Sequence, residues 1–145
     1  MSNKMRLEFD AISQNELFAR NVVALFALPL EPDVSELSDI KTAVSEAVTN
    51  CIVHAYQGKG GRVSLDCAIE DKTLHIKISD EGRGIADLDL AMQPFYSTLP
   101  DDERAGMGFT IMQTFMSDFD VESALGSGTK ITMRKVIGEG KKENA

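Results

Sequence analysis

The chain has few residues of several types, and each shortage argues against a class of protein. Its 145 residues include two cysteines, four prolines and no tryptophan. Two cysteines cannot build the dense disulfide framework of a small secreted domain. No apolar run approaches the roughly 20 residues of a membrane-spanning helix. Acidic residues interrupt the amino-terminal segment too early for a secretory signal, so we expect a cytoplasmic protein without a membrane span.

Basic residues are also few, with 15 Lys and Arg against 23 Asp and Glu and a formal net charge of −8. This balance argues against general binding to nucleic acid and is compatible with a basic protein partner. Cys51 and Cys67 fall on the apolar sides of predicted elements, which indicates core residues in a reducing compartment. The length suits one domain over residues 1–145, and the polar segment 137–145 is expected to be a flexible tail.

Apolar periodicity predicts two hairpins and several helices. The predicted strands cover residues 4–10, 62–70, 73–80, 119–125 and 128–136, and the predicted helices cover 13–28, 33–56, 86–92 and 107–118. Ser13 followed by Glu16 predicts a capping box for the first helix. Residues 93–106 show no period and form a candidate functional loop. The pattern predicts an α+β fold, a two-layer sandwich with an antiparallel or mixed sheet covered on one face by helices.

The predicted helix 33–56 carries polar residues along the rim of its apolar stripe. Glu46, Asn50 and His54 follow one another at intervals of four residues. An Asn amide oxygen is a suitable ligand for Mg²⁺, and a carboxylate one turn away could act as a general base. A solvated helix edge with no ligand is the alternative interpretation of this spacing alone.

The end of the predicted strand 73–80 is a second candidate site. Asp80 shares the inward parity of the apolar residues before it, and a buried carboxylate needs hydrogen-bond donors such as an adenine amine. Gly82 and Gly84 lack side chains, so their backbone could lie against a flat ring. Thr129 has the inward parity of its own strand and could face the same pocket. An ordinary Asp-Gly turn and a β-favouring Thr remain the alternatives.

Gly106 and Gly108 flank the start of the predicted helix 107–118, where free N–H groups favour phosphate. Ser97, Thr98 and Arg104 precede them and could add contacts from a mobile lid, although an ordinary loop is the alternative. The phosphate-binding pattern G-x-x-x-x-G-K-[ST] is absent, and so are the H-R-D and D-F-G motifs of ordinary protein kinases.

The first predicted helix has two apolar groups of residues. The larger one is the broad apolar side of the helix and comprises Leu17, Phe18, Val22, Leu25 and Leu28. On the other side, Glu16 and Arg20 lie beside Val23 and Ala27, and this side is a candidate contact for a protein partner. Packing of both sides within the fold is the alternative.

Taken together, the motifs resemble those of a known superfamily. Glu46-x-x-x-Asn50, Asp80-x-Gly82-x-Gly84 and Gly106-x-Gly108 are similar, in order and spacing, to the N, G1 and G2 boxes of the GHKL superfamily. Residues 45–56 resemble its small serine-kinase anti-sigma factors, and the resemblance extends over nearly the whole chain. It implies a Bergerat-type fold with a mixed, mainly antiparallel sheet.

The resemblance also implies a role for each site residue. Asn50 would hold Mg²⁺ on the phosphates of ATP or ADP, and Glu46 would be the general base that activates a serine hydroxyl. Asp80, assisted by Thr129, would read the adenine amine. The remaining nucleotide contacts would come from the base-lining Gly82 and Gly84 and from the phosphate-binding segment with Ser97, Thr98, Arg104, Gly106 and Gly108.

The activity implied by the resemblance is that of an anti-sigma factor and ATP-dependent serine protein kinase. Such a protein sequesters a sporulation-type sigma factor of the sigma F type, phosphorylates an anti-anti-sigma factor on serine, and forms a homodimer. It binds no nucleic acid directly. A histidine-kinase-like catalytic domain is one alternative, although no helical hairpin with a phosphoacceptor His precedes the pocket. A nucleotide-gated binding module without catalysis is the other.

Overall fold

A computed structural model describes residues 2–85 and 108–138 of the chain. In chain order the elements are β1 (Ser2–Asp10), α1 (Ser13–Ala27), the 3-10 turn η1 (Leu28–Leu30), α2 (Val34–Thr49), the π-helical segment η2 (Asn50–Ala55), β2 (Arg62–Glu70), β3 (Thr73–Asp80), α4 (Gly108–Phe115), β4 (Asp118–Ser123) and β5 (Thr129–Val136). The helix predicted over 86–92 and the loop predicted over 93–106 lie outside the described residues.

The strands form one five-stranded sheet with the order β1-β2-β3-β5-β4, and each of the described pairings is antiparallel. Both predicted hairpins are confirmed, as β2–β3 and β4–β5. Because β3 and β5 are antiparallel neighbours, the end of β3 meets the beginning of β5, and Asp80 is the register partner of Thr129.

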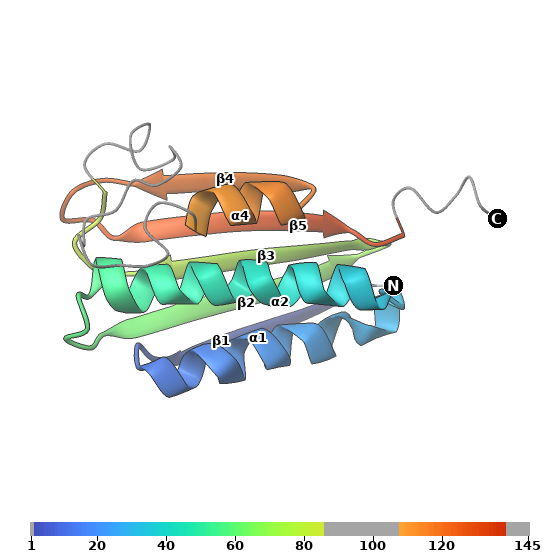
Figure 1. The fold of residues 1–145 in the computed structure, drawn as a ribbon, viewed down its shortest axis with the longest axis horizontal. Helices are drawn as coiled ribbons and strands as arrows, with labels where there is room; N and C mark the ends of the chain where they lie inside the picture. The colour runs from blue at the N-terminus through green and yellow to red at the C-terminus, as the bar shows by residue number, and fades with distance from the viewer. Residues whose placement is uncertain (1, 86–107, 139–145) are drawn as a thin grey trace.

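The helices lie on one face of this sheet (Figure 1). α1 lies beside β1, α2 crosses the middle, and α4 lies beside β4 and β5. α2 packs against both of the other helices. The predicted α+β architecture, with a mainly antiparallel sheet and helices on one face, is confirmed.

The core lies between the two layers. Successive residues of β2 and β3 alternate between buried and partly exposed, as expected for strands with one covered face. The apolar stripe predicted for α2, including Ile40, Val44 and Val48, is fully buried against them. Cys51 and Cys67 are buried and free, which confirms their prediction as core residues.

The capping box predicted for α1 is wrong. α1 follows Ile12, and no side chain caps its first turn. The carboxylate of Glu16 instead accepts a hydrogen bond from the Ser45 hydroxyl of α2 and lies 3.6 Å from the guanidinium of Arg20. A side chain held by the neighbouring helix cannot also reach back to its own N-terminus.

A capping box does begin α2. The carboxylate of Asp33 accepts the N–H of Glu36 at 2.7 Å, and the carboxylate of Glu36 accepts the N–H of Asp33 at 3.0 Å. The second oxygen of Glu36 accepts the N–H of Gly138 at 2.7 Å, which ties the start of this helix to the segment after β5. The beginning of the longest helix is therefore fixed at two points.

The predicted single helix over 33–56 is also corrected. The α-helix ends at Thr49, and the chain continues as a π-helix from Asn50 to Ala55. A π-helical turn widens the helix by bonding each N–H one residue further back, and such turns are frequent at functional sites. The change occurs at Asn50, the residue predicted to hold the metal.

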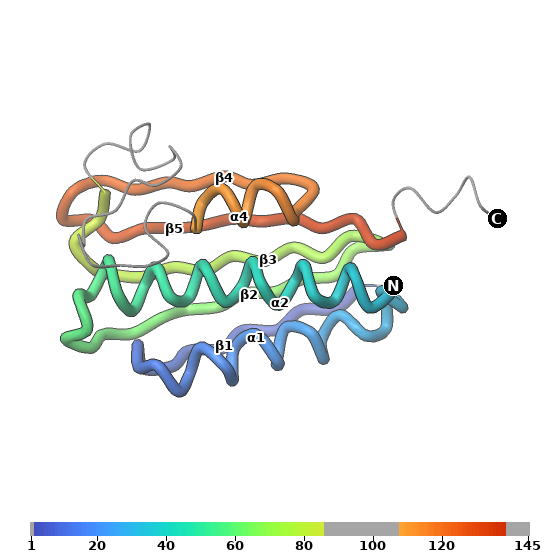
Figure 2. Tube along the Cα trace, viewed as in Figure 1, coloured from blue at the N-terminus to red at the C-terminus, as the bar shows by residue number. Residues whose placement is uncertain are grey.

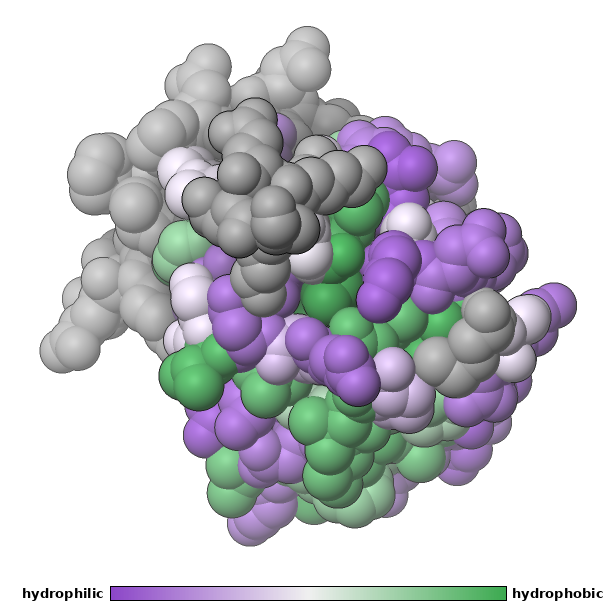
Figure 3. All heavy atoms as spheres, turned by 90° about the vertical axis from the view of Figure 1, so that its right-hand side faces the viewer, coloured by the Kyte–Doolittle hydropathy of each residue, from purple (hydrophilic) through white to green (hydrophobic). Residues whose placement is uncertain are grey.

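The interpretation of Val23 and Ala27 as exposed residues on α1 is wrong. Ala19, Val23 and Ala27 are fully buried. The larger apolar residues are about half exposed or more: Leu17 51%, Phe18 52%, Leu25 66% and Leu28 47%. Small residues let the helix axis approach α2 and the sheet closely, so size outweighed hydrophobicity in selecting the packed side. Figure 3 shows hydrophobic side chains gathered at the lower end of its view, the end that carries α1 and β1.

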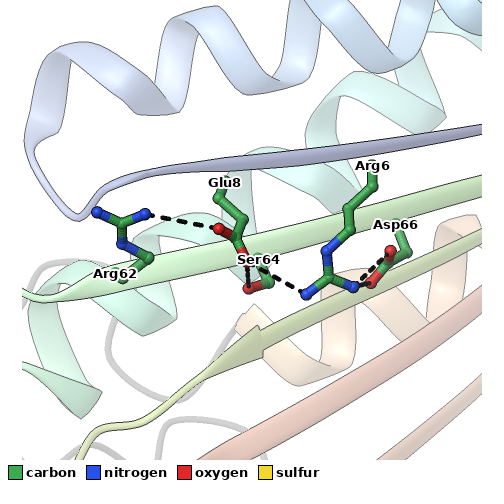
Figure 4. A network of polar contacts seen from close by, with 5 residues as sticks. All are labelled: Arg6, Glu8, Arg62, Ser64 and Asp66. Carbon is green, nitrogen blue, oxygen red and sulfur yellow. Dashed lines mark hydrogen bonds and ion pairs between the residues drawn. The ribbon is translucent and has the colours of Figure 1, made fainter.

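The face of the sheet away from the helices is polar. Arg6 of β1 lies 3.0 Å from Asp66 of β2 and 3.2 Å from Glu8, while Arg62 lies 3.5 Å from Glu8 (Figure 4). Exposed pairs of this kind contribute little to stability, because solvent screens their charges. They favour the register of β1 on β2 more than they stabilise the fold.

Three segments meet at one end of the sheet, on the left of Figure 2. They are η2, the residues that follow β3, and the turn between β4 and β5. Among the described residues, no helix has the length and apolar character needed to cross a membrane.

Candidate functional site

The last cross-strand row on the helix side changes from apolar to polar across the sheet. The register runs from Phe9 through Val63 to Asp80, then to Thr129 and Ser123. The first two members belong to the hydrophobic core. Oxygen-bearing side chains on the last three create a polar patch at the end where η2 and the loops meet.

Asp80 is the centre of this patch, and its predicted inward parity is confirmed, since it is 6% exposed. One carboxylate oxygen, Oδ1, accepts the N–H of Gly82 at 2.9 Å and the N–H of Thr129 at 3.2 Å. Burial raises the pKa of the Asp80 carboxyl, while the N–H of Gly82, the thiol of Cys51 and the N–H of Thr129 lower it. Burial is the largest effect and prevails.

The other carboxylate oxygen of Asp80, Oδ2, is buried and has no hydrogen-bond partner among the described residues. A buried acceptor left unpaired costs about 1–3 kcal/mol, and more when it is charged. Such an atom in a folded protein calls for an explanation. A ligand that brings an N–H donor into the patch would remove this cost.

The residues after β3 are held tightly on two sides. On one side, Arg83 donates from its backbone N to the carbonyl of Ala55 at 3.1 Å and from Nε to the carbonyl of His54 at 3.0 Å. A Cβ on Gly82 would lie 2.5 Å from the same Ala55 oxygen. Gly82 is therefore required for the close approach of the loop to η2.

On the other side the loop meets the β4–β5 turn. Gly84 has a φ of +76°, and a Cβ there would lie 2.0 Å from the carbonyl oxygen of Ala124. Gly126 donates its N–H to the carbonyl of Arg83 at 2.6 Å. The packing of these two backbone segments is thus sufficient reason for a glycine at position 84, and contact of either loop glycine with a base remains a prediction.

Tyr56 is a site residue that the sequence reasoning missed. Its hydroxyl donates to the carbonyl of Arg62 at 2.6 Å and accepts the N–H of Glu81 at 2.7 Å. It therefore joins the end of η2 to the start of β2 and to the residue after Asp80. Burial raises the pKa of its phenol, so the hydroxyl remains protonated at neutral pH.

Glu46 and Asn50 approach the site from the helix layer. Glu46 is 8% exposed, and a Cβ on Gly108 would lie 3.4 Å from its Oε2. The carboxylate of Glu46 therefore faces the first residue of α4. Asn50 is partly exposed at the start of η2. Within the described part of the chain, no group of three or more His, Cys, Asp and Glu side chains is arranged to hold a metal ion.

Part of the predicted site falls outside the description. Ser97, Thr98, Arg104 and Gly106 lie among the residues that the structure does not describe, whereas Gly108 begins α4. The described portion offers one unpaired buried acceptor, a buried carboxylate at α4 and an amide at a π-helical turn. These groups suit a ligand with an amine at one end and anionic groups with a metal ion at the other.

Comparison with known proteins settles the family. Residues 12–135 match the family model described as a histidine kinase-like ATPase domain. The chain belongs to this family. The resemblance to the GHKL superfamily is thereby confirmed.

Relatives of high identity extend over nearly the whole chain. The chain is 55% identical to a protein named anti-sigma F factor from Caldanaerobacter subterraneus subsp. tengcongensis, over 94% of this chain and 96% of that protein. It is 53% identical to the anti-sigma F factor of Clostridium acetobutylicum, with 93% and 94% covered. The anti-sigma F factor of Bacillus licheniformis is 48% identical, with 97% of each covered.

Solved structures agree on the fold. The RsbU and RsbW domains of a Mycobacterium tuberculosis protein superpose with a TM-score of 0.66 at 19% identity, over 93% of this chain and 32% of that longer one. The mycobacterial sensor histidine kinase MprB superposes with a TM-score of 0.56 at 18% identity, over 90% and 97%. At these identities the similarity shows the fold alone.

Proposed function

We propose that this chain is an anti-sigma factor and an ATP-dependent serine protein kinase. It sequesters a sigma factor of the sigma F type and phosphorylates an anti-anti-sigma factor on serine in the cytoplasm. The naming of its relatives as anti-sigma F factors supports the first activity, and membership of an ATPase family implies that the chain binds ATP.

The unpaired Oδ2 of Asp80 is the observation that carries the nucleotide proposal. An exocyclic adenine amine is a planar donor of the right kind for a buried, negatively charged acceptor. The base would lie in the polar patch between η2 and the β4–β5 turn. Its phosphates would extend towards the N-terminus of α4, where backbone N–H groups and the helix dipole favour anions.

The transfer of a phosphoryl group needs a general base and a metal site. The carboxylate of Glu46 and the amide oxygen of Asn50 are suitable groups for these two roles. The amide oxygen of Asn50 would hold Mg²⁺, which when bound supplies neutralisation of the phosphate charge. Glu46 would accept the proton of the acceptor serine while the serine oxygen forms a bond to the γ-phosphorus of ATP. The bond between the γ-phosphorus and the oxygen that bridges it to the β-phosphate would break, and ADP would leave with that oxygen. The burial of Glu46 and its closeness to Gly108 support this role.

The proposed partner surface is the seam between α1 and α2. A groove of about 390 Å³ lies there and is lined by Arg20, Val34, Leu37, Ser38, Lys41 and Thr42. Glu16 lies at its side and orients Arg20 across 3.6 Å. We assign Glu16 and Arg20 to the contact with the sigma factor or the anti-anti-sigma factor, since arginine is enriched in protein interfaces and Glu16 orients this one.

The chain is also proposed to be a homodimer. The exposed side of α1, with Phe18 and Leu25, runs along the edge of the molecule formed by β1, whose outer edge has no partner strand in the described sheet. An apolar helix side next to an open strand edge is a surface that a second copy could cover. Light scattering measures the molar mass of Leu25→Glu, which is expected to fall to that of a monomer. A variant that remains a dimer would show that this side of α1 is not in the interface.

A phosphotransfer assay with labelled ATP and a purified anti-anti-sigma factor tests the kinase proposal. Glu46→Gln is expected to lose transfer and keep nucleotide, whereas Asn50→Ala is expected to lose magnesium-dependent nucleotide affinity. His75→Ala, on the sheet face away from the helices, is the matched control. Normal transfer by Glu46→Gln would refute the assignment of Glu46 as the general base. Absence of transfer by the wild type would refute the kinase proposal and favour a nucleotide-gated binding module.

A further inference from the structure

Ser123, at the end of β4, lies outside the sequence motifs of the site. We propose that Ser123 fixes the direction of the Thr129 hydroxyl, so that Thr129 offers an acceptor to the base and the site selects adenine over guanine. This rests on the proposed function, because it assumes that the base lies against Asp80.

The hydrogen bonds of Ser123 determine what its hydroxyl donates and accepts. Its Oγ accepts the N–H of Ile85 at 2.8 Å, lies 2.9 Å from the carbonyl oxygen of Gly128, and lies 2.8 Å from Oγ1 of Thr129. A serine hydroxyl has one proton to donate and two lone pairs to accept with. Because a carbonyl can only accept, the Ser123 proton goes to Gly128, and the second lone pair of Oγ receives the proton of Thr129.

The unpaired oxygen of Asp80 is compatible with this assignment. Thr129 is the register partner of Asp80 across the β3–β5 pair, and Oδ2 of Asp80 has no partner among the described residues. With its proton donated to Ser123, Thr129 keeps the lone pairs of Oγ1 available for a donor on the base.

Discrimination between purines follows from these protons. Oδ2 of Asp80 and Oγ1 of Thr129 both act as acceptors, which matches the two N–H bonds of an adenine amine. Guanine has a carbonyl at that position, and this carbonyl would meet two acceptors and no donor. If the Thr129 hydroxyl could rotate, it would donate to the guanine carbonyl, and only Asp80 would then face that carbonyl as an acceptor. Ser123 is thus a positioning residue that acts through Thr129.

The experiment measures dissociation constants for ATP and GTP on the full-length chain by calorimetry. Ser123→Ala is expected to lower the ratio of GTP to ATP dissociation constants by roughly three- to tenfold, the size of one neutral hydrogen bond. Ser123→Thr, which keeps a hydroxyl, should restore the ratio. Ser123→Cys is close in shape to the wild type, but its thiol is a weak donor and acceptor. It should lower the same ratio, and it replaces the alanine variant if that variant does not fold.

A double-mutant cycle separates positioning from simple loosening of the loop. In a Thr129→Val background, Ser123→Ala should leave the ratio unchanged, because the hydroxyl through which it acts is gone. Equal losses of ATP and GTP affinity in Ser123→Ala, with the ratio preserved, would overturn the inference while leaving ATP binding intact. A wild-type protein with no preference for ATP over GTP would instead overturn the adenine proposal at Asp80, and this inference with it.

Discussion

Asp80→Asn should raise the stability of the nucleotide-free protein while lowering its affinity for ATP. Asparagine has the shape of aspartate and keeps an acceptor for the N–H groups of Gly82 and Thr129, which lie 2.9 and 3.2 Å from Oδ1. It replaces the unpaired carboxylate oxygen Oδ2 with a neutral amide NH2 group. The two changes in free energy therefore have opposite signs.

The magnitude follows from the difference between two burial costs. An unpaired buried polar group costs about 1–3 kcal/mol, and a charged one costs more. The variant still buries an unpaired amide NH2 group, so only the excess cost due to charge is recovered, about 1 kcal/mol. For a domain of this size that gain corresponds to about 3 °C in Tm. For ATP, a charge-assisted hydrogen bond is lost and a donor then faces the adenine amine, which costs about 3 kcal/mol, or roughly 150-fold in Kd.

The stability gain should depend on pH. Burial raises the pKa of the Asp80 carboxyl in the folded protein, so the folded state holds this proton at pH values where the unfolded chain has released it. The free energy of unfolding of the wild type therefore falls as pH rises from about 4, the ordinary carboxyl pKa, through the raised pKa. The variant lacks this fall, so its advantage should be small at about pH 4 and should grow as the pH rises through the raised pKa of Asp80.

Thermal melts without nucleotide between pH 4 and pH 8, together with calorimetric titration of ATP, measure both effects. Asp66→Asn on the exposed sheet face is a control for removal of one negative charge, since its partner Arg6 is solvent-exposed. A variant less stable than the wild type at neutral pH would show that Oδ2 of Asp80 has a partner in the free protein. Unchanged ATP affinity would place the adenine elsewhere.

Further predictions concern the turn, Tyr56 and the two cysteines. Gly128 has a φ of +78°, and a Cβ there would lie 2.2 Å from a carbonyl oxygen, so Gly128→Ala should cost about 3 kcal/mol or more in urea unfolding. Gly126→Ala, with a φ of +83° and open space, should cost about 1–2 kcal/mol. Tyr56→Phe removes the hydroxyl that holds the loop after β3, and its ATP affinity in a titration should fall about threefold or more. Burial raises the pKa of the Cys51 thiol strongly and that of Cys67 to about 12, so neither should react with a thiol reagent at pH 8 until the protein unfolds. Rapid labelling of the native protein would contradict the packing of η2 or β2.

Strand parity predicted the centre of the site correctly. Leu74, Ile76 and Ile78 define an inward face, and Asp80 continues it two residues later. The alternation is a property of the local backbone, so it survives any tertiary arrangement. The same reasoning placed Thr129 on the inward side of β5, and both residues are buried.

Tertiary packing explains what the sequence reasoning predicted incorrectly. The carboxylate of Glu16 was assigned to a local capping box, but the Ser45 hydroxyl of the neighbouring helix is its partner. The exposure of Leu25 and the burial of Ala19 depend on how closely two helices approach, which no single helical pattern contains. The π-helical turn at Asn50 likewise has no signature in apolar periodicity.

Tyr56 and Ser123 show why part of a site escapes motif reasoning. Their partners are mostly backbone groups remote in sequence or across a turn, such as the N–H groups of Glu81 and Ile85. A backbone N–H is present in nearly every residue type, so it leaves no trace in the sequence. Only the fold identifies which hydroxyl will meet it.

The cost of an unpaired Asp80 connects the stability of this fold to its ligand. A ligand that binds only the folded state stabilises it by about 2.7 kcal/mol when present at a hundred times its Kd. That gain is comparable with the cost of burying one unpaired polar acceptor. The polar end of the last sheet row, with η2 and two glycine-containing turns packed around it, is therefore the part of the core that the nucleotide is proposed to complete. Loss of the nucleotide should loosen this end of the sheet before it affects the apolar end at Phe9 and Val63.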